Sequence, residues 1–223
     1  MKKEEGSTSD MRNRTEKRKI KCVIYDCDGV LFDSLDANGR LYEDICQALG
    51  RPPLKHEELS YIHVHTVFEA IRFISGNDEA LEKKALDIWK GIDIKRYIPL
   101  LKMEPHLLET LDELARRGIR RVISTNRTTS MPHVMESFNL TSYFDMVVTA
   151  LDVKHPKPHP ESVEKILESL HLHRHEVLFV GDSEVDQQTA ESSAVRFVAY
   201  KNRDIRNDAF IEDHFELFGL IES

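Results

Sequence analysis

The stretch CVIYDCDGVLFDS, residues 22–34, decides how the rest of the chain can be arranged. Its first four residues are apolar without alternation, as in a strand that is covered on both faces of a sheet. Asp26 and Asp28 follow directly, and Gly29 then permits a sharp turn. Side chains two residues apart in extended chain point the same way, so we expect both carboxylates on one face and Cys27 on the other, in the core.

Four further short apolar runs follow later in the chain, at residues 122–124, 146–149, 177–180 and 197–200. Helical patterns separate most of them. Leu107, Leu111 and Leu114, for example, repeat on one helical face before Gly118. Strands that alternate with helices predict an α/β fold, here a Rossmann-like parallel sheet core with helices on both faces.

The interval between residues 34 and 105 interrupts this alternation. It contains three helical patterns, at residues 41–49, 67–74 and 81–89, and no convincing strand. We therefore predict an α-helical cap over residues 34–105, inserted into an α/β core formed by residues 20–33 and 106–223. Residues 1–19 are polar and charged, and we expect them to form a disordered tail.

Composition limits the classes of partner. The 223 residues are 40% hydrophobic and 31% charged, which is ordinary for a soluble globular protein. A net charge of -8 argues against a nucleic-acid partner, and no apolar run reaches the roughly 18 residues that cross a membrane. The first residues lack the apolar segment of a secretory signal, and the three cysteines lack metal-ligand spacing. We expect a cytoplasmic protein with reduced thiols and no membrane partner.

Polar side chains follow or lie close to the ends of the predicted strands. They are Asp26 and Asp28, Thr125 and Asn126, Lys157, and Asp182. Ligands of an open parallel sheet bind beyond the carboxyl ends of its strands, so we expect these residues to converge. Clustered carboxylates repel one another unless a cation joins them, and an all-oxygen site suits Mg²⁺. A lysine and a hydroxyl beside it suit a phosphoryl group. The pattern predicts metal-assisted phosphoryl transfer to a carboxylate nucleophile.

At these residues the chain resembles the haloacid dehalogenase superfamily. Residues 26–30, DCDGV, resemble its first motif and Thr125 its second. Lys157 in KPHP resembles the third, and residues 181–183 with Asp186 resemble the fourth. All four stand in the family's order. The predicted helical insert is similar to the small cap of phosphoglycolate phosphatases and β-phosphoglucomutases.

The resemblance implies a Mg²⁺-dependent phosphatase that acts on a small phosphorylated metabolite, as a phosphoglycolate phosphatase does. It implies that Asp26 attacks phosphorus and forms an aspartyl-phosphate. Asp28 would protonate the leaving oxygen and then deprotonate the attacking water. Mg²⁺ would be held by Asp26, the backbone carbonyl of Asp28, and Asp182.

The same resemblance assigns phosphate binding. The Thr125 hydroxyl and the Asn126 amide would bind phosphoryl oxygens, and Lys157 would neutralise their charge.

Four further residues have two interpretations each. Asp186 either supports the site from behind or simply completes a helix capping box with Ser183. Arg127 either meets a second anionic group of the substrate or is an exposed arginine at a helix start. His63 and His65 either face the substrate from the cap or are surface residues.

Two other functions are compatible with the motifs. A sugar phosphomutase would share all four, but the mutases of the family carry a histidine in the first cap helix near Asn38, and an asparagine cannot replace its proton chemistry. This difference favours hydrolysis. A non-catalytic binding protein usually lacks a motif residue, and none is missing here.

Overall fold

Six parallel strands form the central sheet of the computed structural model, which describes residues 19–222. Their order across the sheet is β5-β4-β1-β6-β7-β8. The strands are β1 (Cys22–Tyr25), β4 (Arg120–Ser124), β5 (Met146–Val148), β6 (Val177–Gly181), β7 (Arg196–Tyr200) and β8 (Ala209–Ile211). The predicted α/β class and all five predicted strands are confirmed. The edge strand β8 was not predicted.

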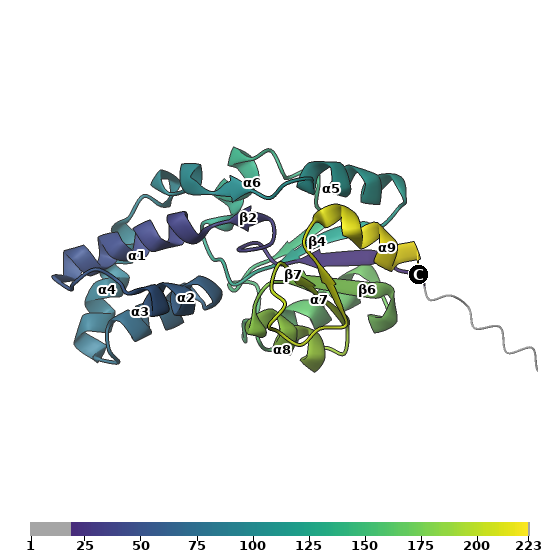
Figure 1. The fold of residues 1–223 in the computed structure, drawn as a ribbon. Helices are drawn as coiled ribbons and strands as arrows, with labels where there is room; N and C mark the ends of the chain where they lie inside the picture. Colours follow the sequence, from purple (N-terminus) through teal and green to yellow (C-terminus); the bar gives the residue numbers. More distant parts are fainter. Residues whose placement is uncertain (1–18, 223) are drawn as a thin grey trace, which may run out of the picture.

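Helices cover both faces of this sheet (Figure 1). One face carries α5 (Leu107–Arg116), α6 (Met131–Ser137) and α9 (Leu217–Glu222), and the other carries α7 (Glu161–Leu170) and α8 (Glu184–Ser192). The side chains of β1 alternate between the two hydrophobic layers: Val23 and Tyr25 belong to the first, Cys22 and Ile24 to the second. A strand buried on both faces explains the continuous apolar run. Cys27 is buried in the first layer, as predicted.

The helices that lie between β1 and α5 in the chain are placed beyond the sheet and have a hydrophobic cluster of their own (Figure 1). They are α1 (Leu35–Leu49), α2 (His56–Val64), α3 (Val67–Ile74) and α4 (Glu79–Gly91), followed by the single turns η1 (Ile94–Arg96) and η2 (Ile98–Leu100). Short strands β2 (Phe32–Asp33) and β3 (Lys102–Met103) pair antiparallel, so the two connections to the sheet lie side by side. The exact division into cap and core stays a prediction.

Local sequence signals explain where these helices begin. Thr66 and Glu69 form a reciprocal capping box at the start of α3, and Asp78 caps α4. At the other end of α1, Gly50 has a left-handed backbone, the conformation in which helices commonly end.

Other sequence-based expectations have mixed outcomes. The described residues contain no helix that is both long and apolar enough to cross a membrane. All three cysteines are free and buried. The predicted tail lies outside the described residues, apart from Lys19, and stays a prediction.

One buried imidazole supports the turn that follows β1. His214, in the short turn η4 (His214–Glu216), is fully buried, stacks on Tyr200, and its Nε2–H donates to the Val30 carbonyl at 2.9 Å. Burial lowers the pKa of this histidine to about 4, although Glu104 and Asp213 oppose the shift. The neutral ring therefore fixes the backbone next to Asp28 and Gly29.

We predict that His214 makes the protein less stable in acid. Between pH 6.5 and about 4 the unfolded chain binds a proton at this residue and the folded chain does not, so stability falls as pH falls through that window. The contribution is at most about 3 kcal/mol. Urea unfolding at pH 7.5 and pH 5 measures it. The His214→Gln variant should lose less stability between the two pH values than the wild type, and an equal loss in both would contradict the assignment.

Candidate active site

The polar residues predicted from the strand ends converge on one pocket between the sheet and the inserted helices. The sheet side of this pocket is lined by Asp26, Asp28, Thr125, Asn126, Arg127, Lys157 and Asp182. The helix side includes Asn38, His63 and His65. The pocket thus lies at the carboxyl ends of β1, β4 and β6, where an open parallel sheet binds its ligands.

Lys157 is the cation at the base of the pocket. Its Nζ lies 2.8 Å from Asp26 Oδ1 and 2.6 Å from Asp186 Oδ1, and its side chain is only 3% exposed. Burial alone would lower the pKa of the lysine, but the two carboxylates outweigh it and hold the pKa above its ordinary value. A buried charge is tolerated when it is paired in this way.

Three carboxylates lie close together here, and Lys157 pairs with two of them, Asp26 and Asp186. Asp26, Asp182 and Asp186 each offer an oxygen within 4.8 Å of the others. Burial, together with the charge of Asp186, raises the pKa of Asp26 to about 7 despite Lys157. Burial, together with the charges of Asp186 and Asp26, raises the pKa of Asp182 well above its ordinary value. A divalent cation would relieve this repulsion, and a donor set made only of carboxylate oxygens fits Mg²⁺.

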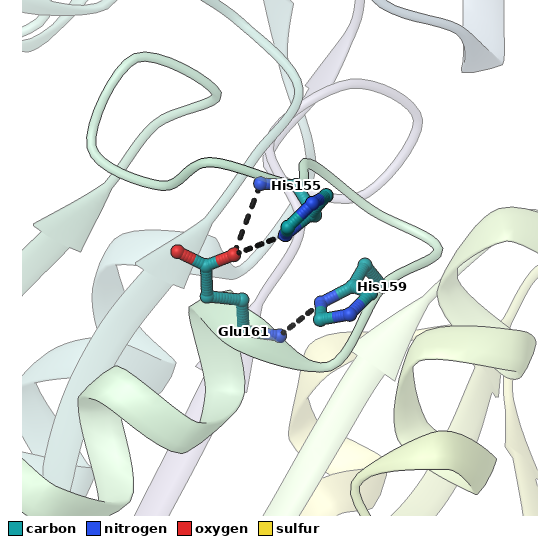
Figure 2. Close-up of side chains that lie close together, drawn as sticks. All are labelled: His155, His159 and Glu161. Carbon is teal, nitrogen blue, oxygen red and sulfur yellow. Dashed lines mark hydrogen bonds and ion pairs between the residues drawn. The ribbon is translucent and has the colours of Figure 1, made fainter.

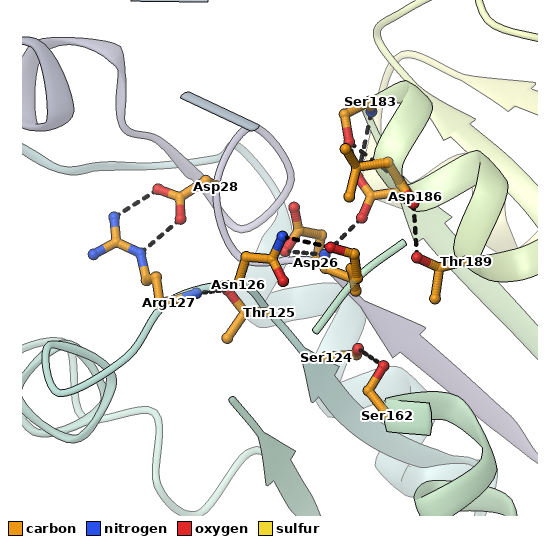
Figure 3. Close-up of polar contacts among 12 residues, drawn as sticks. Asp26, Asp28, Ser124, Thr125, Asn126, Arg127, Ser162, Ser183, Asp186 and Thr189 are labelled. Atoms are coloured by element: carbon orange, nitrogen blue, oxygen red, sulfur yellow. Dashed lines mark hydrogen bonds and ion pairs between the residues drawn. The ribbon is translucent and has the colours of Figure 1, made fainter. Parts of the chain in front are cut away.

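Asp186 combines both interpretations that the sequence left open. Its carboxylate accepts hydrogen bonds from the Ser183 hydroxyl at 2.7 Å and from two backbone amides at the start of α8, so it completes the capping box. It also holds Lys157 from behind, and it does not line the pocket. Figure 3 shows it between Ser183 and the centre of the cluster. Asp26 and Asp182 are therefore the carboxylates that face the pocket.

Gly29 allows Asp182 to approach the turn after β1. Its φ is +75°, and a Cβ at this position would lie 1.9 Å from Asp182 Oδ2. An L side chain would be strained by the left-handed backbone and would also collide with the carboxylate. The close approach of Asp182 therefore explains why the first motif has a glycine at position 29.

Arg127 pairs with Asp28 across the pocket (Figure 3). Two guanidinium nitrogens donate to the two Asp28 oxygens, at 2.6 and 2.8 Å, and the arginine side chain is 11% exposed. Burial would raise the pKa of Asp28, but Arg127 and then His63 outweigh it and the net pKa is lowered. The interpretation of Arg127 as an exposed arginine is wrong, because a bidentate ion pair holds it inside the site.

Thr125 and Asn126 follow the end of β4 and make different contacts. The Thr125 hydroxyl oxygen accepts a hydrogen bond from the Arg127 amide at 3.1 Å, so its own proton can still be donated. The Asn126 side chain donates to the Lys157 carbonyl at 3.2 Å, and its buried Oδ1 has no hydrogen-bond partner among the described residues. The loop of Lys157 is thereby tied to β4.

The two cap histidines differ in their surroundings. His63 Nδ1 lies 3.2 Å from Asn38 Nδ2, and that same amide reaches Asp28 Oδ1 at 3.4 Å. His65 instead stacks on Tyr61 and its Nδ1 is 2.8 Å from the Tyr61 carbonyl, within its own segment. The sequence indicated Asn38 only as the position near which the family's mutases carry a histidine, and it did not indicate the contact with Asp28. The sequence signal that could have indicated this contact is the position of Asn38 in the first turn of α1, shortly after the first motif.

Comparisons with known proteins agree with this arrangement. The family described as haloacid dehalogenase-like hydrolase matches residues 23–200. A phosphoglycolate phosphatase of Rhodobacter capsulatus is 28% identical over 80% of this chain and 83% of its own. A pyrophosphatase PpaX of Oceanobacillus iheyensis is 24% identical over 81% and 83%. The crystal structure of a subfamily IA HAD-superfamily hydrolase from Geobacter sulfurreducens superposes with a TM-score of 0.80 at 40% identity, covering 90% of this chain and 99% of that one.

We predict that Gly29→Ala damages the pocket far more than the fold. Alanine in a left-handed backbone costs about 1–2 kcal/mol, and the collision must in addition displace Asp182. Gly118→Ala is the matched control, because its φ is +71° and a Cβ there meets nothing within 4 Å. Thermal unfolding should show similar losses in both variants. Only Gly29→Ala should lose hydrolysis of a phosphate ester, and full activity in that variant would contradict the proposed contact.

Proposed function

The chain belongs to the haloacid dehalogenase-like hydrolase family, and we propose that it hydrolyses a small phosphorylated metabolite, with Mg²⁺ as cofactor and Asp26 as nucleophile. The observation that carries this proposal is the meeting of Asp26 and Lys157 in a buried pocket that Asp28 and Asp182 also line. A carboxylate held by a lysine suits attack on a charged phosphoryl group.

Asp26 would attack phosphorus, forming a bond from a carboxylate oxygen while the bond to the leaving oxygen breaks. Lys157, 2.8 Å from Asp26 Oδ1, would stabilise the charge that collects on the phosphoryl oxygens. The Thr125 hydroxyl lines the same pocket and can donate to one of those oxygens. Asp186 would act on the reaction through Lys157, which it positions.

The carboxylate cluster is the part of the site that would hold Mg²⁺. Asp26 and Asp182 face the pocket, and the Asp28 backbone carbonyl completes the proposed ligand set. When bound, the cation would supply charge neutralisation between the nucleophile and the phosphoryl oxygens. Its presence would also favour the ionised form of Asp26, which the nucleophilic role requires.

Asp28 would carry the protons. Its carboxylate is bonded to Arg127, which lowers its pKa and so favours the ionised form, a state suited to accept a proton from the attacking water. To donate a proton to the leaving oxygen it must first take one up, which requires the contact with Arg127 to loosen. A second anionic group on the substrate would give Arg127 another partner at that moment.

The names of the relatives agree with such a substrate. One is called a phosphoglycolate phosphatase and another a pyrophosphatase. Both substrates are small, and each carries a second anionic group beside the phosphoryl group that is transferred. Arg127 lines the pocket and would meet that group. We therefore propose a small, doubly anionic phosphoester or phosphoanhydride.

A phosphomutase stays the second candidate, because of one contact. The family's mutases carry a histidine near the position of Asn38, and here the imidazole of His63 reaches Asn38 from α2. The residue at position 38 therefore does not by itself exclude mutase chemistry. Hydrolysis and isomerisation are distinguished by product.

Phosphate release from a panel of phosphorylated metabolites, measured with Mg²⁺ and after exhaustive chelation, tests the proposal. We expect one small anionic substrate to be favoured, turnover to require the cation, and Asp26→Asn to abolish it, because an amide cannot form the acyl-phosphate. Full turnover after chelation would contradict the metal assignment. An isomerised sugar phosphate in place of free phosphate would favour the mutase.

Asp28→Asn separates the second carboxylate from the first. Its backbone carbonyl is unchanged, so Mg²⁺ binding should persist while turnover falls by about 10²–10⁴-fold. A wild-type rate on an ester with an ordinary alcohol leaving group would remove Asp28 from the mechanism.

We predict that His63 recognises the substrate and that His65 does not. His63→Ala should raise KM for the preferred metabolite on the order of tenfold, the value of one hydrogen bond of about 1.4 kcal/mol. It should leave hydrolysis of p-nitrophenyl phosphate nearly unchanged. His65→Ala is the matched control, since its ring is held by Tyr61. Equal effects of the two substitutions on KM would contradict a specific role for His63.

A further inference from the structure

A second group of potential metal ligands lies outside the pocket, on the outer side of the loop that carries Lys157. Among the residues that the structure describes, His155, His159 and Glu161 each offer one donor atom within 4.8 Å of the others. Figure 2 shows both rings turned toward Glu161, at the start of α7. The proposed hydrolysis does not use any of these side chains.

Glu161 is held in place by the loop itself. Its carboxylate accepts hydrogen bonds from the Lys154 amide at 2.8 Å, the His155 amide at 3.0 Å and His155 Nδ1 at 2.9 Å. The hydrogen bond from Lys154, followed by those from His155, lowers the pKa of Glu161 to about 2. The low pKa favours the ionised carboxylate. Oε1 accepts one of these hydrogen bonds and keeps a lone pair for another partner, while Oε2 accepts two.

The two imidazoles are close together and accessible. Their ring centroids are 4.6 Å apart, both residues are exposed, and His159 Nδ1 accepts a hydrogen bond from the Glu161 amide at 3.2 Å. They also line one shallow surface hollow. The sequence HPKPHPE, residues 155–161, places a proline at every second position, and each proline fixes its own φ. Little conformational freedom remains to be lost when a ligand binds.

We propose that His155, His159 and Glu161 form a binding site for a divalent transition-metal ion of the zinc class. Two imidazole nitrogens and one carboxylate oxygen are the donors that Zn²⁺ takes, with water in a fourth position. Mg²⁺ prefers oxygen donors, so ligand type separates this site from the carboxylate cluster of the pocket. The inference goes beyond the proposed hydrolysis and does not depend on it.

Binding requires a small, balanced rearrangement. His155 Nδ1 and Glu161 Oε2 now share a proton at 2.9 Å, and the metal would take the place of that proton. In the tautomer with its proton on Nε2, the Nδ1 lone pair of His155 is free to bind the metal. His159 would exchange its hydrogen bond from the Glu161 amide for a bond to the metal.

The position of the site gives it a structural consequence. His155 and His159 each lie two residues from Lys157, whose side chain points to the other side of the loop, toward Asp26. A metal that links both histidines to Glu161 would hold the two ends of this loop together. The loop that positions Lys157 would then open less often.

Calorimetric titration of the full chain with Zn²⁺, in excess Mg²⁺ and without substrate, tests the site. We expect one equivalent to bind, and His155→Ala or His159→Ala to weaken binding by at least roughly 10–100-fold. Zn²⁺ should also slow amide hydrogen exchange in residues 152–161 of the wild type. His173→Ala and His175→Ala are matched controls, because these exposed rings stack on each other elsewhere on the surface, and they should bind as the wild type does.

Two further variants separate this site from the pocket. Asp182→Asn should retain the zinc equivalent, and Glu161→Gln should weaken it. Binding that survives in the loop variants, or that is lost only in Asp182→Asn, would overturn the proposal. Hydrolysis in Mg²⁺ by His155→Ala and His159→Ala should stay at the wild-type rate, which verifies that the loop is folded. Because zinc binding is measured without turnover, the titration can be interpreted even if the protein shows no phosphatase activity.

Discussion

The ion pairs of Lys157 with Asp26 and Asp186 are the interaction on which the rest of the site depends. The buried ammonium group lies between Asp26, which follows β1, and Asp186, which also completes the capping box at the start of α8. Removing the lysine would leave buried carboxylates without their shared cation, a change that typically costs several kcal/mol. The position of Asp26 and the start of α8 are therefore coupled through the Lys157 side chain.

The carboxylates around Lys157 carry more negative charge than the lysine can balance. Burial and mutual repulsion raise the pKa values of Asp26 and Asp182, and Gly29 gives Asp182 the room to approach. Such a cluster is unfavourable alone and favourable around a cation. The opposite arrangement exists at Asp28, where Arg127 balances the charge and the pKa is lowered. Two aspartates two residues apart thus have different proton affinities. In the proposed mechanism a bound cation would lower the proton affinity of Asp26, and loosening of the Arg127 contact would raise that of Asp28.

The inserted helices complete the pocket rather than merely covering it. Asn38 from α1 contacts both His63 from α2 and Asp28, so the proposed substrate-binding histidine is linked to the proposed acid–base group through one amide. His65, two positions from His63, is held by Tyr61 instead. The family match and the named relatives confirm the enzyme class that the motifs predicted, a phosphatase-type hydrolase. We propose that these cap contacts select the substrate.

Short-range patterns in the sequence were sufficient for five strands of the central sheet, the capping box of Ser183 and Asp186, and the order of the motifs, because an apolar run and a helix start depend on neighbouring residues. They also predicted that the polar strand ends would meet, since parallel strands share one edge. They did not predict the Asp28–Arg127 pair, whose members are 99 positions apart and meet only because β1 and β4 are paired in register. Nor did they predict that Asp186 both caps a helix and holds Lys157. Side-chain partners across strands are selected by tertiary packing, which a local pattern does not contain.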